Sequence, residues 1–175
     1  EQARRTACLA NLRSVGTAIR MYATENGGVI PFGPTAPPMI SPADFYPCTG
    51  SPTSLISLMN GKPVGLGLLL AVHLSQQPRV LFCPSADQPT DIQGQLANVG
   101  KTQAQCSYYY RHGSNPSSSP TAPVPTNFLR LENLGTNRVG TPVRALAMDT
   151  QFVCPPNLAS FGVRPATHHQ RKASN

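Results

Sequence analysis

The stretch TACLANLRSVGTAIRMYATENGG, residues 6–28, decides the fold of this chain. Its apolar residues recur every three or four positions, which is the spacing of one face of an α-helix. These residues are Leu9, Leu12, Val15 or Gly16, Ile19 and Tyr22. The sequence therefore predicts an amphipathic helix over residues 1–26, with its arginines facing solvent. Asn26-Gly27-Gly28 ends this helix, because glycine adopts the left-handed conformation of a helix end at little cost.

The start of the predicted helix lacks the usual signals. No Ser, Thr, Asp or Pro stands at a capping position, and Glu1 and Gln2 are good helix formers. We therefore expect the helix to begin upstream of residue 1, so that residues 1–26 are the C-terminal half of a longer helix.

The composition narrows the class of protein. The 175 residues carry 14 Lys and Arg against 7 Asp and Glu, a formal charge of +7. Charged residues make up 12% of the chain, against a usual value of about 25%. The positive balance thus reflects few acids, which argues against a dedicated nucleic-acid binder. The 19 Pro and 14 Gly disfavour a helical bundle and favour a loop-rich α+β or β domain.

Short apolar runs follow the first helix and alternate with loops. We expect a strand or short helix over 53–60, a short buried helix over 65–75, and strands over 79–83, 106–111, 142–148 and within 151–163. The segment 85–103 is polar and is expected to be irregular. Two loops are expected, a Pro-rich one over 30–53 and a Ser/Pro-rich one over 113–126. The length predicts one domain, residues 1–175.

The five cysteines are widely dispersed: Cys8, Cys48, Cys83, Cys106 and Cys154. No two of them have the C-x-x-C spacing, so a structural zinc site is not expected. Dispersed cysteines in a Pro-rich chain suit disulfides in an oxidising compartment. Five buried thiols in a cytosolic protein are the alternative. Because the number is odd, at least one cysteine has no partner within the chain.

Three consecutive tyrosines, Tyr108 to Tyr110, lie in the predicted strand 106–111. Aromatic side chains can stack on nucleic-acid bases. Alternate residues of a strand face opposite ways, however, so the three cannot form one platform. We expect one tyrosine to face inward and two to face outward.

The sequence holds no motif of an enzyme. It contains no G-x-S-x-G, no P-loop and no G-x-G-x-x-G. His73 is interpreted as a histidine at the edge of the core, and adjacent His168 and His169 as an exposed polar tail. We therefore expect no catalytic residue, no cofactor and no metal site.

Four blocks of the sequence resemble the type IV pilin-like, type II secretion pseudopilin family, most closely its planctomycete-type members. The first block runs from Ala3 to Pro31 and contains Cys8-Leu9-Ala10-Asn11-Leu12, which is similar to the C-x-x-N-L motif of the family's long helix. The other blocks are Gly65-Leu66-Gly67-Leu68 followed by Leu81-Phe82-Cys83-Pro84-Ser85, then Ser107 to Tyr110, then Arg138 to Asp149. The blocks follow the family's order along most of the chain. The family's apolar N-terminal half-helix is not part of it.

The resemblance implies an α+β fold in which a long N-terminal helix packs on an antiparallel sheet. The helix residues implied to face the sheet are Leu9, Leu12, Val15, Ile19 and Tyr22. Each buried aliphatic side chain contributes about 1.5–3 kcal/mol, so this stripe would be the main source of stability. The resemblance also suggests disulfides, Cys8–Cys83 first and Cys106–Cys154 second.

The function implied by the resemblance is structural. The chain would be a subunit of a type IV pilus-like filament or a type II secretion pseudopilus, without catalysis. Its partners would be other pilin or pseudopilin subunits and the inner-membrane assembly machinery. An upstream helix would anchor it in the inner membrane before assembly, with the domain on the periplasmic or extracellular face. The arginines of the helix (Arg4, Arg5, Arg13, Arg20) would contact acidic neighbours, or would simply be a solvated face.

Other functions remain open at this point. A secreted or periplasmic binding module would present the Pro-rich loops to a ligand. A DNA-binding pilin would use the charge of +7, and its binding would fall steeply with salt. A thiol- or metal-dependent enzyme would use the cysteines and histidines, but it lacks a base close to a cysteine in the sequence.

Overall fold

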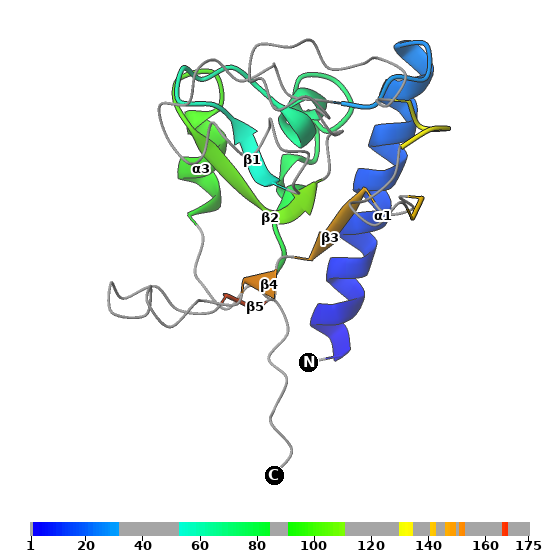
Figure 1. The fold of residues 1–175 in the computed structure, drawn as a ribbon. Helices are drawn as coiled ribbons and strands as arrows, with labels where there is room; N and C mark the ends of the chain where they lie inside the picture. Colours follow the sequence, from blue (N-terminus) through cyan, green and yellow to red (C-terminus); the bar gives the residue numbers. More distant parts are fainter. Residues whose placement is uncertain are drawn as a thin grey trace.

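The computed structural model describes residues 2–31, 53–84, 91–110, 130–134, 141–142, 146–149, 151–152 and 166–167. Within these residues the chain has an α+β fold with a long N-terminal helix and an antiparallel sheet, as expected (Figure 1). The elements are α1 (Gln2–Glu25), β1 (Thr53–Ser57), the 3-10 helices η1 (Gly65–Leu70) and η2 (Pro78–Leu81), α3 (Ile92–Asn98), β2 (Ala104–Tyr110), β3 (Ala147–Asp149), β4 (Gln151–Phe152) and β5 (Ala166–Thr167).

Helix α1 ends where the sequence predicts. Gly27 and Gly28 have positive φ angles of 63° and 86°, and the N–H of Gly28 donates to the carbonyl of Ala23 at 2.6 Å. The side chain of Asn26 donates to the carbonyl of Tyr22 at 2.8 Å. These bonds satisfy carbonyls that the last turn of a helix otherwise leaves open.

The main sheet has the order β1-β2-β3, with antiparallel neighbours. Its central strand β2 has Cys106, Tyr108 and Tyr110 buried, whereas Tyr109 is only half-buried. Two tyrosines therefore face inward, and the expectation of one inward and two outward is wrong. A strand of period two must put either one or two of three consecutive residues on its buried face, and the central strand places the pair there.

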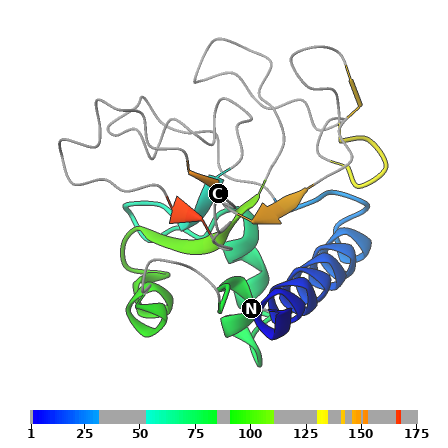
Figure 2. The same cartoon turned by 90° about the horizontal axis from the view of Figure 1, so that it is seen from below.

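Helix α1 does not lie directly on the whole sheet. It packs on η1, η2 and the edge strand β3. Figure 2 shows the 3-10 segments (residues 65–81) between α1 and α3. The fully buried side chains that fill this arrangement are Cys8, Val15, Ile30, Ile56, Leu66, Leu69, Leu81, Tyr108 and Tyr110. The core is thus mainly aliphatic, with two tyrosines.

Three short elements differ from the sequence-based expectations. Residues 79–83 do not form a strand: Pro78 opens the 3-10 helix η2, and the N–H of Phe82 bonds back to the carbonyl of Arg79 at 3.0 Å. The segment 85–103 is not irregular throughout, because Asp91 caps α3 by accepting from the N–H of Gly94 at 3.0 Å. The expected helix over 65–75 is the 3-10 helix η1 followed by turns.

Several expectations fall on residues that the structure does not describe. They concern most of the Pro-rich loop 30–53, all of the Ser/Pro-rich loop 113–126, Cys48, Cys154 and the histidines of the tail. The strands expected over 142–148 and within 151–163 are described only in part, as β3 and β4.

Candidate functional site

The candidate site is helix α1 together with the residues that fasten it to the body. One turn of α1 carries the motif Cys8-x-x-Asn11-Leu12, and each motif residue makes a separate attachment. Cys8 forms a disulfide with Cys83, with an S–S distance of 2.08 Å and a Cα–Cα distance of 5.4 Å. The amide of Asn11 donates to the carbonyl of Phe82 at 3.0 Å. Leu12 packs against the main core cluster.

The inner stripe of α1 follows from helix geometry. Cys8, Leu12, Val15 and Ile19 are separated by four, three and four residues, so they lie on one face. Cys8, Val15 and Ile19 are at most 3% exposed, and Leu12 and Tyr22 are half-buried against the core. The expectation that Leu9 faces the sheet is wrong: Leu9 is 50% exposed. Cys8 takes its place on the stripe, because a residue one position along is rotated by about 100°.

The cysteines divide into a bonded pair and a buried thiol. The pairing Cys8–Cys83, which the resemblance placed first, is present. The pairing Cys106–Cys154 is not formed, because Cys106 holds a free thiol that contacts the carbonyl of Tyr108 at 3.3 Å. Its side chain lies on the core face of β2. Burial raises the pKa of the Cys106 thiol to about 12, which keeps it protonated and makes it a poor nucleophile at neutral pH.

Alkaline pH is expected to destabilise the protein through buried β2 side chains. Burial raises the pKa of Tyr110 as well as that of Cys106. In the unfolded chain both groups titrate with their ordinary pKa values, about 8.5 for Cys and about 10 for Tyr. Above about pH 8.5 the unfolded chain binds fewer protons than the folded one, so stability falls as the pH rises.

Urea unfolding from about pH 7.5 to about pH 10 measures this loss. Cys106→Ala should flatten the early part of the decline and leave the part due to Tyr110. A midpoint independent of pH in wild type would contradict the role of these two groups.

His73 joins the end of α1 to the turn after η1. Its Nε2 lies 3.3 Å from Oε2 of Glu25, and its ring meets the ring of Tyr22 edge-on with centroids 5.9 Å apart. Its side chain is 4% exposed. These contacts place the histidine at the edge of the core, as interpreted from the sequence. The expectation that it is satisfied there is met only in part, because its buried Nδ1 has no hydrogen-bond partner among the described residues. Among the residues that the structure describes, no three His, Cys, Asp or Glu side chains group as a metal site would require.

The outer face of α1 is basic and uncovered. Arg13 and Arg20 are exposed on this face, together with Leu9 and Met21, which are each about half exposed. Arg4 and Arg5 are exposed as well, but they stand four and three residues before Cys8 and therefore lie on the side of the inner stripe, in the first turns of the helix. The one acid between Gln2 and Glu25 is Glu25 itself, in the last turn. In the described part of the chain, no helix has both the length and the apolar character needed to cross a membrane.

Gly16 lies in the middle of α1, and a Cβ built on it has no heavy atom within 4 Å. A helical glycine costs about 0.5–1 kcal/mol relative to alanine. Gly16→Ala is therefore expected to raise the free energy of unfolding by about 0.5–1 kcal/mol. Denaturant unfolding of the two proteins tests this, and a loss of stability would mean that the space beside Gly16 is not open.

The sequence identified Cys8, Cys83 and most of the inner stripe, but it gave Asn11 no contact of its own. The signal was present in the spacing, because Asn11 lies three residues after Cys8 and therefore on nearly the same face.

No protein-family model, no curated protein and no solved structure matches this chain.

Proposed function

We propose that this chain is a non-catalytic subunit of a type IV pilus-like or type II secretion pseudopilus filament. Its partners would be further pilin or pseudopilin subunits and the inner-membrane assembly machinery. It would be held in the inner membrane by an upstream helix before assembly, with its domain on the periplasmic or extracellular face.

The observation that carries the proposal is the attachment of α1 by its Cys-x-x-Asn-Leu motif. The disulfide of Cys8 and the hydrogen bond of Asn11 both reach the Leu81-Phe82-Cys83 block. A helix fixed in this way moves with the body as one unit. A filament built from helices needs this property, because force on the helix must reach the domain that it carries.

The other blocks that carry the resemblance also meet one another. The phenolic hydroxyl of Tyr110 donates to the carbonyl of Pro31 at 2.7 Å. Gly65 faces the ring of Tyr110, with a built Cβ 3.1 Å from Cδ1. Strand β3, from the last block, pairs with Tyr108 to Tyr110. Segments far apart in the sequence thus form one contiguous core, which supports treating the four blocks as one pattern.

The uncovered face of α1 is where a neighbouring subunit would bind. No acid stands three or four positions from Arg13 or Arg20, the exposed arginines of this face, so the complementary partner surface is acidic. The exposed Leu9 and Met21 add apolar area to the same helix.

Filament incorporation of the full-length protein in its own cells tests the proposal. The double variant Arg13→Glu and Arg20→Glu should lower the amount recovered in the sheared, high-mass fraction several-fold without changing the unfolding midpoint. Lys101→Glu is the matched control, because it reverses an exposed cation that lies after α3. Recovery of the double variant at the wild-type level would contradict binding through this face. Absence of the wild-type protein from the high-mass fraction would contradict the filament proposal itself.

A further inference from the structure

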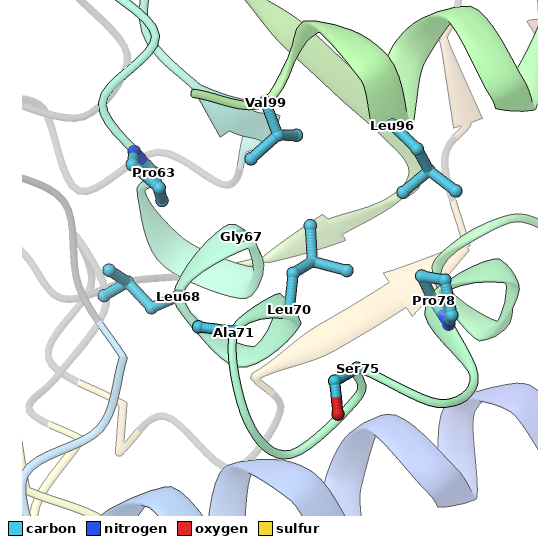
Figure 3. Close-up of a pocket in the computed structure, with 9 residues that line it drawn as sticks. All are labelled: Pro63, Gly67, Leu68, Leu70, Ala71, Ser75, Pro78, Leu96 and Val99. Carbon is cyan, nitrogen blue, oxygen red and sulfur yellow. The ribbon is translucent and has the colours of Figure 1, made fainter. Parts of the chain in front are cut away.

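A cavity of about 450 Å³ lies between η1 and α3, away from α1 (Figure 3). Its walls are almost entirely apolar. The residues that line it include Pro63, Leu68, Leu70, Pro78, Leu96 and Val99. A space of this size falls within the range of small-molecule sites, about 300–1,000 Å³.

Polar bonds hold α3 beside this pocket, in addition to the packing of its apolar residues Ile92 and Leu96 against the core. Gln95 accepts at its Oε1 from the N–H of Gln105 in β2 at 2.7 Å. Asp91 caps the first turn, and the N–H of Gly100 bonds to the carbonyl of Gly61 at 3.0 Å. No residue of α3 is fully buried. Figure 3 shows Leu70 projecting from η1 and Leu96 from α3 at the lining of this pocket.

Two lysines stand at one end of the cavity. Lys62 precedes the lining residue Pro63, and Lys101 follows Val99 by two positions. The Gly61–Gly100 hydrogen bond brings the two segments together, so the backbones of both exposed lysines lie at the end of the pocket that Pro63 and Val99 form. The nearest acid in the sequence, Asp91, starts α3 at its other end and is occupied by the cap. Within the described residues 53–84 and 91–110 Asp91 is the one acid, so among these residues no carboxylate accompanies the two lysines at this end.

We propose that this cavity binds a free fatty acid, with its alkyl chain between η1 and α3 and its carboxylate beside Lys62 and Lys101. Apolar cavities take up apolar molecules, and an engineered cavity of about 150 Å³ already holds benzene. The carboxylate is the complement of the two lysines. The site is independent of filament assembly and of the face of α1 assigned to it.

Titration of the purified protein with dodecanoate, followed by methyl NMR, tests the site. We expect saturable binding of one equivalent, with shifts confined to methyl groups such as those of Leu68, Leu70 and Leu96. Decanoate and octanoate should bind progressively more weakly, by up to about fourfold per methylene removed. The affinity for dodecanoate should fall as salt is raised.

Variants distinguish the contribution of the fatty-acid carboxylate to binding from that of the alkyl chain. The double variant Lys62→Gln and Lys101→Gln should weaken dodecanoate binding by roughly fivefold and leave binding of neutral dodecanol unchanged. Arg13→Gln, on the outer face of α1, is the control because it removes an exposed cation from a helix that contributes no residue to the pocket, and it should bind dodecanoate as wild type does. Val99→Phe should block both ligands by filling the cavity. Absence of saturable shifts at these methyl groups would overturn the proposal, as would unchanged dodecanoate affinity in the double lysine variant.

Discussion

Gly67→Ala is expected to lower the free energy of unfolding by about 3 kcal/mol. Gly67 lies in η1, where the chain passes directly over β1. A Cβ built on Gly67 collides with the carbonyl oxygen and carbonyl carbon of Ile56. The Cα of Ile56 lies only 3.1 Å from that built Cβ. All three atoms belong to the backbone, so no side-chain rotation relieves the clash.

Ile56 cannot easily move aside. Its carbonyl accepts from the N–H of Val64 at 3.0 Å, and its neighbours Leu55 and Ser57 are paired with β2. Alanine at position 67 must therefore push η1 off the sheet, which would disturb the buried Leu66 and Leu69. Urea unfolding measures the loss. Gly16→Ala is the matched control, because the same substitution there meets open space and should stabilise. Equal stability of Gly67→Ala and wild type would show that η1 does not approach β1 so closely.

Removing the Cys8–Cys83 disulfide is expected to lower the free energy of unfolding by about 4 kcal/mol in the chain-entropy model, because the bond joins residues 75 positions apart. The double variant Cys8→Ala and Cys83→Ala should unfold at a much lower urea concentration than wild type. The half-buried hydrogen bond of Asn11 to Phe82 should remain but be too weak alone, at about 1 kcal/mol, to hold this end of α1.

Cys106→Ala is the matched cysteine control. It removes a buried thiol without breaking a covalent link, so it should retain the wild-type response to reductant. Wild type treated with dithiothreitol should unfold as the double variant does. If reduced and oxidised wild type have the same unfolding midpoint, the Cys8–Cys83 bond does not stabilise the fold.

The first helix was predictable because its information is local. The apolar residues between positions 8 and 25 recur at helical spacing, and the pair Gly27-Gly28 indicates where the helix ends. Strand β2 was predictable from its β-prone tyrosines in the same way. Helix α3 was missed, since residues 85–103 were expected to be irregular, although Asp91 stands at a capping position before a short run containing Ile92 and Leu96.

Other features depended on contacts between distant segments. The disulfide partner of Cys8 is Cys83, 75 positions away, and no local pattern of the sequence identifies that partner. The run after Pro78 reads equally well as a strand or a 3-10 turn, and its packing against α1 decides between them. The apolar pocket could not be predicted from a local sequence pattern, because its lining residues come from segments far apart in the sequence, including η1 and α3.

Mass spectrometry of the mature N-terminus is the most direct test of the proposed function. It should be applied to the native protein taken from membrane and sheared-surface fractions. The filament proposal predicts a start about 25–35 residues before Glu1, at an N-methylated Phe or Met that opens an apolar helix. A start after an ordinary cleaved signal peptide, or at Glu1 itself, would contradict it and would leave a secreted binding module as the better description.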